Sequence, residues 1–500
     1  MIRRRNKNRK TLGPIIIMII ISFVVTILSL ILNKLGIQSS VTEAGTFETT
    51  IVTIKNIFSK EGIQYIFGDA VKNFRALEPL VMIVISLIAV LVLEASGLLK
   101  HIFGGLKNVR PSFITAIVLL ISILSTIIGD YSYAILFPLI AVLYKIINRD
   151  PKLGIMTVFI GITAGYGAGI IYTYQDILLG GITELSAVDI INTYVFKGNS
   201  LMFISSVSAI ALTIVGTILI EKNLAKKAKR YEEPELITSP QALKAAGATF
   251  LVLLVIAIYS VIPGMPLSGW LLDMSGNTYA EKLFNPASPF KDGFMVVFVV
   301  ISLICGYVYG KVSRNIKNSR EYNSAIAGAF QNTGFIFAGL FFASIMISIL
   351  SWTNISTVLS LKLINLVGNN QMTGIFLILL MFIICIIVTM FNPSTVANWQ
   401  LVSPVFVPLL MRANISPEFI QMIFKASDSI GKCLTPFNIF LIIMLGFLYK
   451  YDNENEELEL FGTMKKLMPI FIGMTITWII IILGWYLLGF NIGIGTSITL

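Results

Sequence analysis

Three charged residues, Lys425, Asp428 and Lys432, stand in a strongly apolar part of the chain. They occupy positions i, i+3 and i+7, so they share one helix face if the helix continues through them. Charged side chains at bilayer depth are costly and usually face protein interior or water, where they bind ions or substrates. The three could neutralise one another. Because the triplet carries a net positive charge, however, a ligand carboxylate could pair with the remaining ammonium group.

Three aspartates are candidates for ion or proton binding. Asp428 could exchange protons, because the proton affinity of a buried carboxylate depends strongly on its neighbours. Asp130 and Asp176 lie in polar interruptions of apolar segments in the first half of the chain. Each of these two could bind an ion or substrate, or could instead serve as a helix cap or turn former.

The segment NPSTVANW, residues 392–399, interrupts a second apolar region. Its side-chain oxygens suit Na⁺, and its donors suit a carboxylate, although a polar turn could also satisfy itself. The candidates are Asn392, Ser394, Thr395 and Asn398. Trp399 could anchor the chain at the membrane interface or form an aromatic wall for a flat substrate ring. We favour the wall, because the residue adjoins a polar tip.

Composition identifies the environment that must position these residues. The chain has 500 residues, of which 56% are hydrophobic and 13% charged. Apolar runs of about 20 residues recur, and that length crosses a bilayer, so the chain is predicted to be a polytopic membrane protein. Its net charge of +11 is concentrated in short loops, as the positive-inside rule expects. Nucleic-acid binding is disfavoured, because no basic face interleaved with aromatic residues lies outside the membrane.

Cysteine and histidine offer little chemistry. The three cysteines lie in apolar segments without metal-binding spacing, and they are expected to pack in the core. A single histidine, His101, follows Lys100 in a basic loop. Histidine-based metal or triad chemistry is therefore nearly excluded, and Na⁺ is the only metal ion expected.

The charge pattern predicts nine membrane crossings and two re-entrant hairpins within one transmembrane domain, residues 11–490. A basic tail (1–10) is expected in the cytoplasm and a short tail (491–500) outside. The first half is 79–221 with hairpin 112–147, and the second is 323–490 with hairpin 372–412. Residues 35–78 are expected to form an outer loop, and residues 355–371 to lie along the outer surface.

The two hairpin regions resemble each other. GDYSYAILFPL and NPSTVANWQLVSPVFVPL both place a polar tip before an apolar arm that contains a proline. The glycine-rich TAGYGAG, with Gly165 and Gly167, corresponds to SDSIGKC (residues 427–433), and both are expected to break helices. Pro417 and Pro436 are further candidate breaks. Because the hairpins enter from opposite sides, the halves form an inverted repeat, which is typical of secondary transporters.

Several stretches together resemble the p-aminobenzoyl-glutamate transporter (AbgT) family, over roughly residues 79–490. They are PLIAVLYKIINRDPKLG, GITAGYGAG with DILLGGIT, FNPASPF, NWQLVSPVFVPLLM, SPEFIQMIFKASDSI and LTPF. The resemblance implies a dimer whose subunits have nine transmembrane helices and two re-entrant hairpins, with substrate held between hairpins and broken helices. It also implies ion-gradient-driven movement of p-aminobenzoyl-glutamate or related compounds, and some members are reported to export sulfonamides.

By position, five residues match family positions tied to transport: Asp176, Trp399, Pro417, Asp428 and Pro436. Asp130 sits where the family places an acid in the first hairpin. Three features depart from the family pattern. Lys425 replaces the usual arginine, the tip 392–398 replaces a run of small residues, and Lys432 is an added charge.

The sequence therefore predicts an all-α polytopic protein of the cell (plasma) membrane that transports a small anionic aromatic compound and is not an enzyme. Trp399 would stack on the ring and Lys425 would offset the carboxylate, with Asn398 nearby. Asp428, Asp176, Asp130 and the tip oxygens would bind Na⁺ or carry H⁺, with no other cofactor. Membrane lipid and a second copy of the chain are the expected partners. Drug efflux by the same machinery is the alternative, and an intramembrane aspartyl protease using Asp130 and Asp428 is a distant one.

Overall fold

Eight helices are long and apolar enough to cross a membrane within the part of the chain that the computed structural model describes. That part comprises residues 12–45, 48–171, 173–197, 199–227, 237–276, 278–284, 287–367, 374–452 and 458–500, so the predicted tail 1–10 lies outside it. The eight are α1 (Pro14–Lys34), α3 (Glu78–Ser96), α5 (Pro111–Leu124) with its 3-10 extension η2 (Ser125–Ile128), α9 (Met202–Asn223), α10 (Pro240–Tyr259), α12 (Pro289–Ser313), α14 (Gly334–Trp352) and α20 (Leu460–Leu488). The predicted all-α, polytopic fold class is confirmed.

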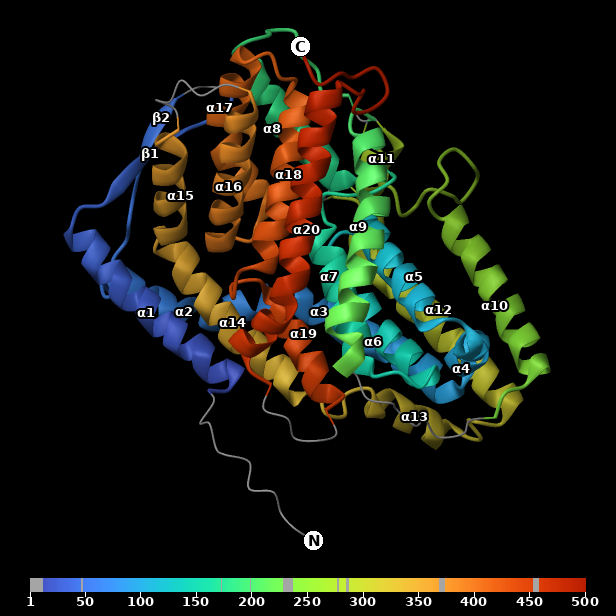
Figure 1. Ribbon diagram of the computed structural model, residues 1–500. Coiled ribbons are helices and arrows are strands. Elements are labelled where there is room, and N and C mark those ends of the chain that lie inside the picture. The colour runs from blue at the N-terminus through green and yellow to red at the C-terminus, as the bar shows by residue number, and fades with distance from the viewer. Residues whose placement is uncertain are drawn as a thin grey trace.

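Shorter helices complete the centre of the bundle (Figure 1). They are α6 (Tyr131–Ile146), α7 (Pro151–Ala164), α8 (Tyr174–Ala187), α16 (Ile375–Phe391), α17 (Thr395–Arg412), α18 (Pro417–Cys433) and α19 (Ile439–Lys450). Seven of the eight long helices coincide with predicted crossings. The other two predicted crossings are interrupted midway, as α7–α8 and α18–α19. Small peripheral helices are α4 (Leu98–Phe103), η1 (Gly104–Asn108), η3 (Ala225–Lys227), α11 (Tyr279–Phe284) and α13 (Ser319–Gly328).

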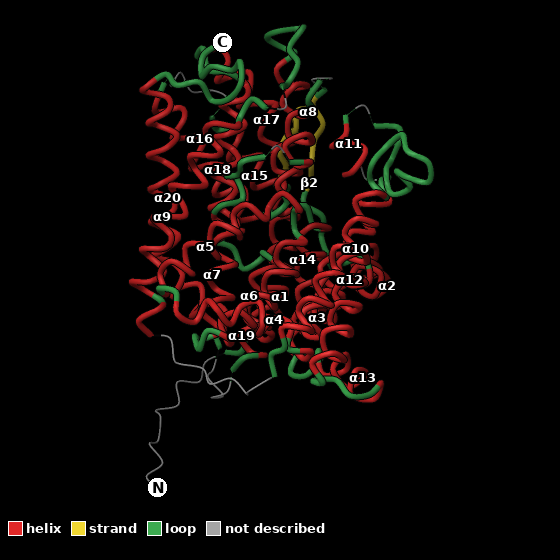
Figure 2. The backbone as a smooth tube through the Cα atoms, turned by 90° about the vertical axis from the view of Figure 1, so that its right-hand side faces the viewer, coloured by secondary structure: helices red, strands yellow, loops and turns green. Residues whose placement is uncertain are grey.

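The two predicted hairpins lie at opposite ends of the bundle. Helices α16 and α17 lie toward the end of the bundle where the C-terminus is found, and α5 and α6 lie toward the opposite end (Figures 1 and 2). Their connecting turns approach each other, because Asp130 of the first and Thr395 of the second line the same cavity. The arrangement is the one that an inverted repeat produces. The re-entrant course of the hairpins and the sides of the membrane on which the termini lie stay predictions.

Two segments differ from their predictions. Residues 35–78 contain an antiparallel pair, β1 (Gln38–Thr42) and β2 (Thr49–Thr53), followed by α2 (Lys60–Arg75). The side chain of Ser59 accepts a hydrogen bond from the Gly62 N–H and so caps α2. Residues 355–365 form α15 (Ile355–Asn365), whose apolar face is buried in the bundle and does not lie on the outer surface. Its buried side chains recur at helical spacing, which the alternating pattern in the sequence obscured.

The second helix break was also predicted in the wrong place. The segment Ser427–Cys433 stays helical, and the interruption lies at residues 434–438, which include Pro436. Gly431 has a packing role, because a Cβ there would stand 2.5 Å from the Thr389 Cβ of α16. A glycine therefore allowed two helices to approach closely without ending either of them.

Helix α18 occupies the centre of the bundle. Every one of its residues is buried except Lys425, which is partly buried. It packs against α16 and α17 of the second hairpin region and against α7 and α8 of the first half. Polar groups on α18 must therefore find their partners among these helices, because bulk water is remote.

Candidate functional site

Asp428 is a buried charge with several bonded partners. Its side chain is 1% exposed. Oδ1 accepts a hydrogen bond from the Thr389 hydroxyl at 2.9 Å, and Oδ2 accepts one from the Thr395 hydroxyl at 2.7 Å. Thr389 lies in the last turn of α16 and Thr395 begins α17, so this carboxylate joins both helices of the second predicted hairpin to α18. Both carboxylate oxygens of Asp428 therefore act as hydrogen-bond acceptors.

Lys432 supplies the positive charge for Asp428. Its Nζ lies 3.1 Å from Asp428 Oδ2, one helical turn away. The same ammonium group donates to the Thr395 hydroxyl and lies 3.7 Å from the centre of the Tyr166 ring. An ammonium group over an aromatic face is stabilised by the ring quadrupole, more so away from water. Lys432 therefore connects α18 with the glycine-rich break of the first half.

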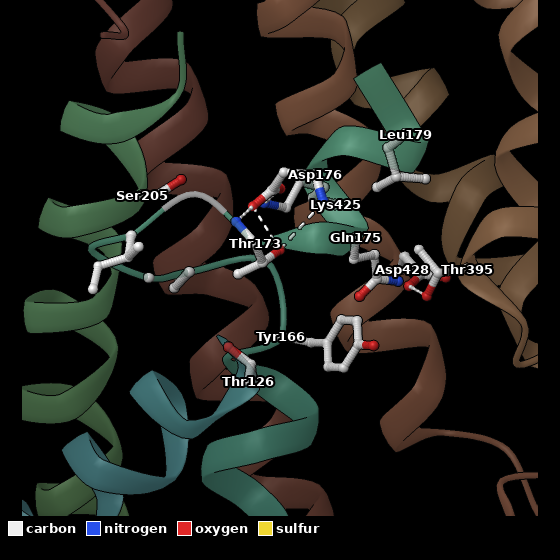
Figure 3. A pocket seen from close by; sticks show the side chains of 13 residues that line it. Thr126, Tyr166, Thr173, Gln175, Asp176, Leu179, Ser205, Thr395, Lys425 and Asp428 are labelled. Atoms are coloured by element: carbon white, nitrogen blue, oxygen red, sulfur yellow. Dashed lines mark hydrogen bonds and ion pairs between the residues drawn. The ribbon is translucent and has the colours of Figure 1, made fainter. Parts of the chain in front are cut away.

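Asp176 forms the second buried pair, with Lys425 of α18 (Figure 3). Asp176 belongs to a capping box in the first turn of α8. Its Oδ2 accepts from the backbone N–H of Thr173 at 3.0 Å and from the Thr173 hydroxyl at 2.8 Å. The carboxylate is thus held at the positive end of a helix dipole as well as by the lysine. The interpretation of Asp176 as a helix cap is therefore confirmed, and its role in binding an ion or substrate stays a prediction.

The charges of the site balance. Lys425 pairs with Asp176 and Lys432 pairs with Asp428. Within the triplet Lys425, Asp428 and Lys432 alone, one positive charge has no counter-charge. In this conformation that charge is neutralised by Asp176, which lies 249 positions away in sequence. A ligand carboxylate must therefore compete with an aspartate for a lysine.

Asp130 differs from Asp176 and Asp428 because no lysine pairs with its carboxylate among the described residues. It precedes α6 at the turn of the first predicted hairpin and is exposed to a cavity of about 400 Å³. Its carboxylate has no hydrogen bond or ion pair with the described residues. The cavity is also lined by Tyr133, Ser394 and Lys432. An unpaired carboxylate facing a cavity of this size is positioned to receive a cation or a proton.

A second, smaller cavity of about 30 Å³ lies beside both ion pairs. Asp176, Lys425 and Asp428 line it, together with Thr126 from the first hairpin turn (Figure 3). About 10–15 Å³ suffices for one water molecule, so the space suits one or two waters or a small ion. Tyr166, Gln175 and Thr395 line both cavities. In this conformation these three residues form the wall between the cavities.

The glycine-rich break brings the first half against α18. Gly165 ends α7, and a Cβ there would stand 2.6 Å from Ile123 Cγ1. The Gly167 N–H donates to the Ser429 hydroxyl at 2.7 Å, and that hydroxyl donates to the Lys425 carbonyl at 2.7 Å. Gly165 thus stands where α7 ends, and Gly167 permits a close approach to the backbone of α18. Ser429 was not identified from the sequence, because its partner lies 262 positions away.

Gly167→Ala should destabilise the protein by about 1–3 kcal/mol, the usual cost of overpacking a buried contact. The added Cβ would stand 2.8 Å from the Lys425 carbonyl oxygen, and backbone on both sides must shift. Thermal unfolding in detergent measures the effect. Gly169→Ala is the matched control, because its nearest atom is 3.9 Å away. Equal unfolding temperatures for the two variants would contradict the close approach.

Most polar side chains in the turn of the second predicted hairpin form hydrogen bonds within that hairpin. Asn398 Nδ2 donates to the Asn392 carbonyl at 2.6 Å and to the Thr389 hydroxyl at 3.3 Å. Asn392 Oδ1 in turn accepts from the Ser394 N–H at 3.2 Å. Asn398 Oδ1 is buried without a hydrogen-bond partner among the described residues. Thr395 and Ser394 line the large cavity, so the turn contributes both a rigid frame and part of the cavity wall.

Trp399 is fully buried between helices. Its ring stacks on Phe424 with centroids 4.6 Å apart, and its Nε1 donates to the Leu179 carbonyl at 3.1 Å. The lining of the two cavities described above does not include it. In this conformation Trp399 joins α17, α8 and α18. The role of its ring in substrate stacking stays a prediction.

The two prolines differ in position. Pro436 lies in the interruption between α18 and α19, as predicted for a helix break. Pro417 is the first residue of α18 and interrupts no helix, so that prediction was wrong. Proline suits this position because it lacks only an N–H that has no partner in the first turn. Tyr166 and Thr173 were missed, although a Thr-x-x-Asp pattern before α8 signals the capping box.

Comparisons with known proteins agree with one another. A family model described as the AbgT putative transporter family matches residues 8–500. The chain is 25% identical over 492 residues to the p-aminobenzoyl-glutamate transport protein of Escherichia coli (strain K12), covering 96% of this chain and 93% of that protein. It is similar to the Alcanivorax borkumensis YdaH transporter, described as having an unusual topology (24% identity, 96% and 100% coverage, TM-score 0.49). It is also similar to Neisseria gonorrhoeae MtrF, described with a class of antimetabolite efflux pumps (24% identity, 98% of each chain, TM-score 0.48).

Proposed function

The chain belongs to the AbgT putative transporter family, and from that premise we propose that it is a secondary active transporter of p-aminobenzoyl-glutamate or a related small aromatic carboxylate or amide. The name of the Escherichia coli relative supports this substrate class. The family and the apolar helices make the protein a membrane transporter, and the proposed activity requires no enzymatic step. Transport would be coupled to Na⁺ or H⁺, and we further propose that the protein acts as a homodimer.

One observation carries the proposal: two lysine–aspartate pairs lie inside an apolar bundle, at helices that are broken or paired in hairpins. Both pairs adjoin the cavity of about 30 Å³, and Lys432 of one pair also lines the cavity of about 400 Å³. Buried pairs contribute little net stability, because desolvation offsets much of the attraction. Charged residues that are kept inside a membrane protein despite this cost usually bind substrates or ions. The cavity volume falls within the range of about 300–1,000 Å³ that is usual for small-molecule sites.

We propose that substrate binds by exchange of carboxylates. A substrate carboxylate would replace Asp176 or Asp428 on its lysine, so each ammonium group keeps a counter-charge throughout. Lys425 presents a compact point charge, whereas an arginine at this position would offer two parallel donors. The contact is therefore less selective for the geometry of the carboxylate. This supports acceptance of compounds that carry one carboxylate on different frames.

The exchange also explains coupling. An aspartate that loses its lysine inside the bundle is an uncompensated buried charge, and it must bind H⁺ or Na⁺ to remain there. Each anionic carboxylate taken up would then be accompanied by one cation. Import and export follow the same steps in opposite order. The gradients across the membrane therefore decide between uptake and drug efflux.

Uptake of labelled p-aminobenzoyl-glutamate by proteoliposomes tests the proposal. Na⁺ and H⁺ gradients are imposed separately, and at least one should drive accumulation above the level of protein-free vesicles. A matched control collapses the active gradient with an ionophore, which should return uptake to that level. Exchange of labelled for unlabelled substrate in the absence of any gradient measures binding and translocation alone. No uptake and no exchange would contradict the proposed substrate class.

A further inference from the structure

The polar face of α18 extends beyond the two ion pairs. Glu418 and Gln421 continue the row that Lys425, Asp428 and Lys432 form. At 3.6 residues per turn all five lie within an arc of about 80° on the helix surface. Apart from Lys425 they are buried, and Glu418 is 6% exposed. A row of this length is unexpected if only two ion pairs require it, because each buried polar group carries a desolvation cost.

Gln421 is bonded at only one end. The Thr183 hydroxyl accepts a hydrogen bond from the Trp399 N–H at 3.0 Å. It lies 2.6 Å from Gln421 Oε1 and 2.8 Å from the Leu179 carbonyl, and it can donate to either. Gln421 Nε2 is buried and has no hydrogen-bond partner among the described residues. Buried amide nitrogens are almost always bonded to protein or to ordered water. The unbonded end of Gln421 therefore marks a place for water between the ion pairs and the start of α18.

Tyr194 marks a second such place. Its hydroxyl oxygen is likewise buried, and within the described part of the chain the Glu418 carboxylate is near enough to interact with it. Burial raises the pKa of this hydroxyl, and the nearby carboxylates of Glu418 and Glu184 raise the pKa further. Tyr194 thus stays protonated and can donate toward Glu418. A hydroxyl and a carboxylate beside each other are groups along which protons pass readily.

Glu418, although buried, is the member of this row nearest to the start of α18. It is in the first turn of α18, and Ser416, just before the helix, donates its N–H to the Ile498 carbonyl at 2.7 Å. Glu418 is therefore at the end of the bundle where the C-terminus lies (Figure 1). Along the helix it is about 10 Å from Lys425, at 1.5 Å per residue. That distance is too long for direct proton transfer but short enough for a few bridging waters.

We infer that Glu418, with Gln421 and Tyr194, forms a proton port between the Asp176–Lys425 pair and the C-terminal face of the bundle. The inference rests on the proposed transport function and assigns H⁺ as a coupling ion. A proton from the aqueous phase binds the Glu418 carboxylate and passes along waters held by Tyr194 and Gln421. It ends on the Asp176 carboxylate when substrate has taken Lys425, and Glu418 returns to its ionised form. Glu418 touches neither substrate nor the ion pairs, so it is a positioning and relay residue.

Glu418→Gln separates the relay from a structural role. In proteoliposomes, accumulation driven by a pH gradient should fall by about 100-fold, the usual scale for loss of a positioned proton-transfer group. Exchange of labelled for unlabelled substrate at equal pH requires no net proton transfer and should be unchanged. Glu418→Asp should restore much of the accumulation. Asp189→Asn, an exposed acid in the segment that follows α8, is the matched control and should leave both activities unchanged.

The outcomes distinguish the port from the transport activity. Accumulation by Glu418→Gln equal to that of the natural chain would overturn the port and leave the transporter assignment intact. The same conclusion follows if Na⁺ alone drives the natural chain. Loss of exchange in Glu418→Gln would point to a structural role and would also overturn the port. A natural chain that exchanges no substrate would overturn the transport function and, with it, the port.

Discussion

Asp428→Asn is expected to abolish gradient-driven transport while the protein remains folded. The amide has nearly the same size as the carboxylate, but it cannot ionise and its nitrogen cannot accept a hydrogen bond. One of the two hydroxyls that donate to Asp428 therefore loses its acceptor, and Lys432 loses its counter-charge. Lys432 keeps the Thr395 hydroxyl and the Tyr166 ring, which should preserve the fold. Uptake under the active gradient should fall to the level of empty vesicles.

Asp69→Asn is the matched control for this substitution. Asp69 also pairs with a lysine on its own helix, Lys72, but the two side chains are 35% and 72% exposed. Exposed pairs contribute about 0–1 kcal/mol, so this variant should transport normally. Size-exclusion profiles and thermal unfolding in detergent verify that both variants are folded. Undiminished transport by Asp428→Asn would exclude Asp428 as an ion or proton carrier.

Lys425→Met is expected to destabilise the protein by about 3–5 kcal/mol, because it leaves the Asp176 carboxylate buried without a cation. Met keeps the length of the side chain, so little packing is lost. The double variant Lys425→Met/Asp176→Asn should recover most of that stability. The asparagine oxygen can still accept from Thr173 and maintain the cap of α8. Neither variant should transport a carboxylate, because both lack the ammonium group that receives it.

The stability of these variants is measured as thermal unfolding in detergent, and transport as uptake in proteoliposomes. Lys425→Arg is the conservative control: it keeps the ion pair and should retain stability, while changing the affinity for substrates with differently spaced carboxylates. A double variant no more stable than Lys425→Met would show that the pair is not coupled as described. Transport by the double variant would place carboxylate binding elsewhere, with Lys432 as the next candidate.

Local patterns in the sequence predicted much of the fold. Seven long apolar runs that were predicted to cross the membrane are long helices in the structure. The spacing of Lys425, Asp428 and Lys432 correctly predicted that they share one helix face. These features depend on periodicity within a single segment. The second break was predicted in the wrong place, because the sequence around Gly431 does not distinguish a helix end from a close contact between two helices.

The pairing of the site could not be predicted in this way. Asp176 and Lys425 meet across 249 positions, and Gly167 meets Ser429 across 262. Which charges neutralise one another depends on how distant helices rotate against each other. The same rotation decides whether Trp399 faces a cavity or a neighbouring helix. The sequence predicted Asp176, Lys425 and Asp428 as candidate site residues, whereas their partners follow from the packing of the bundle.

The neutrality of the two lysine–aspartate pairs has an electrical consequence. An unpaired charge moved through the full membrane potential changes energy by about 2.3 kcal/mol per 100 mV. The Asp176–Lys425 and Asp428–Lys432 pairs carry no net charge, so the membrane voltage does no net work on them when α8 and α18 reorient. A singly charged anion that enters together with one monovalent cation adds no net charge. Transport of a monocarboxylate by this core should therefore be electrically silent, and a dicarboxylate should generate a current unless a second cation accompanies it.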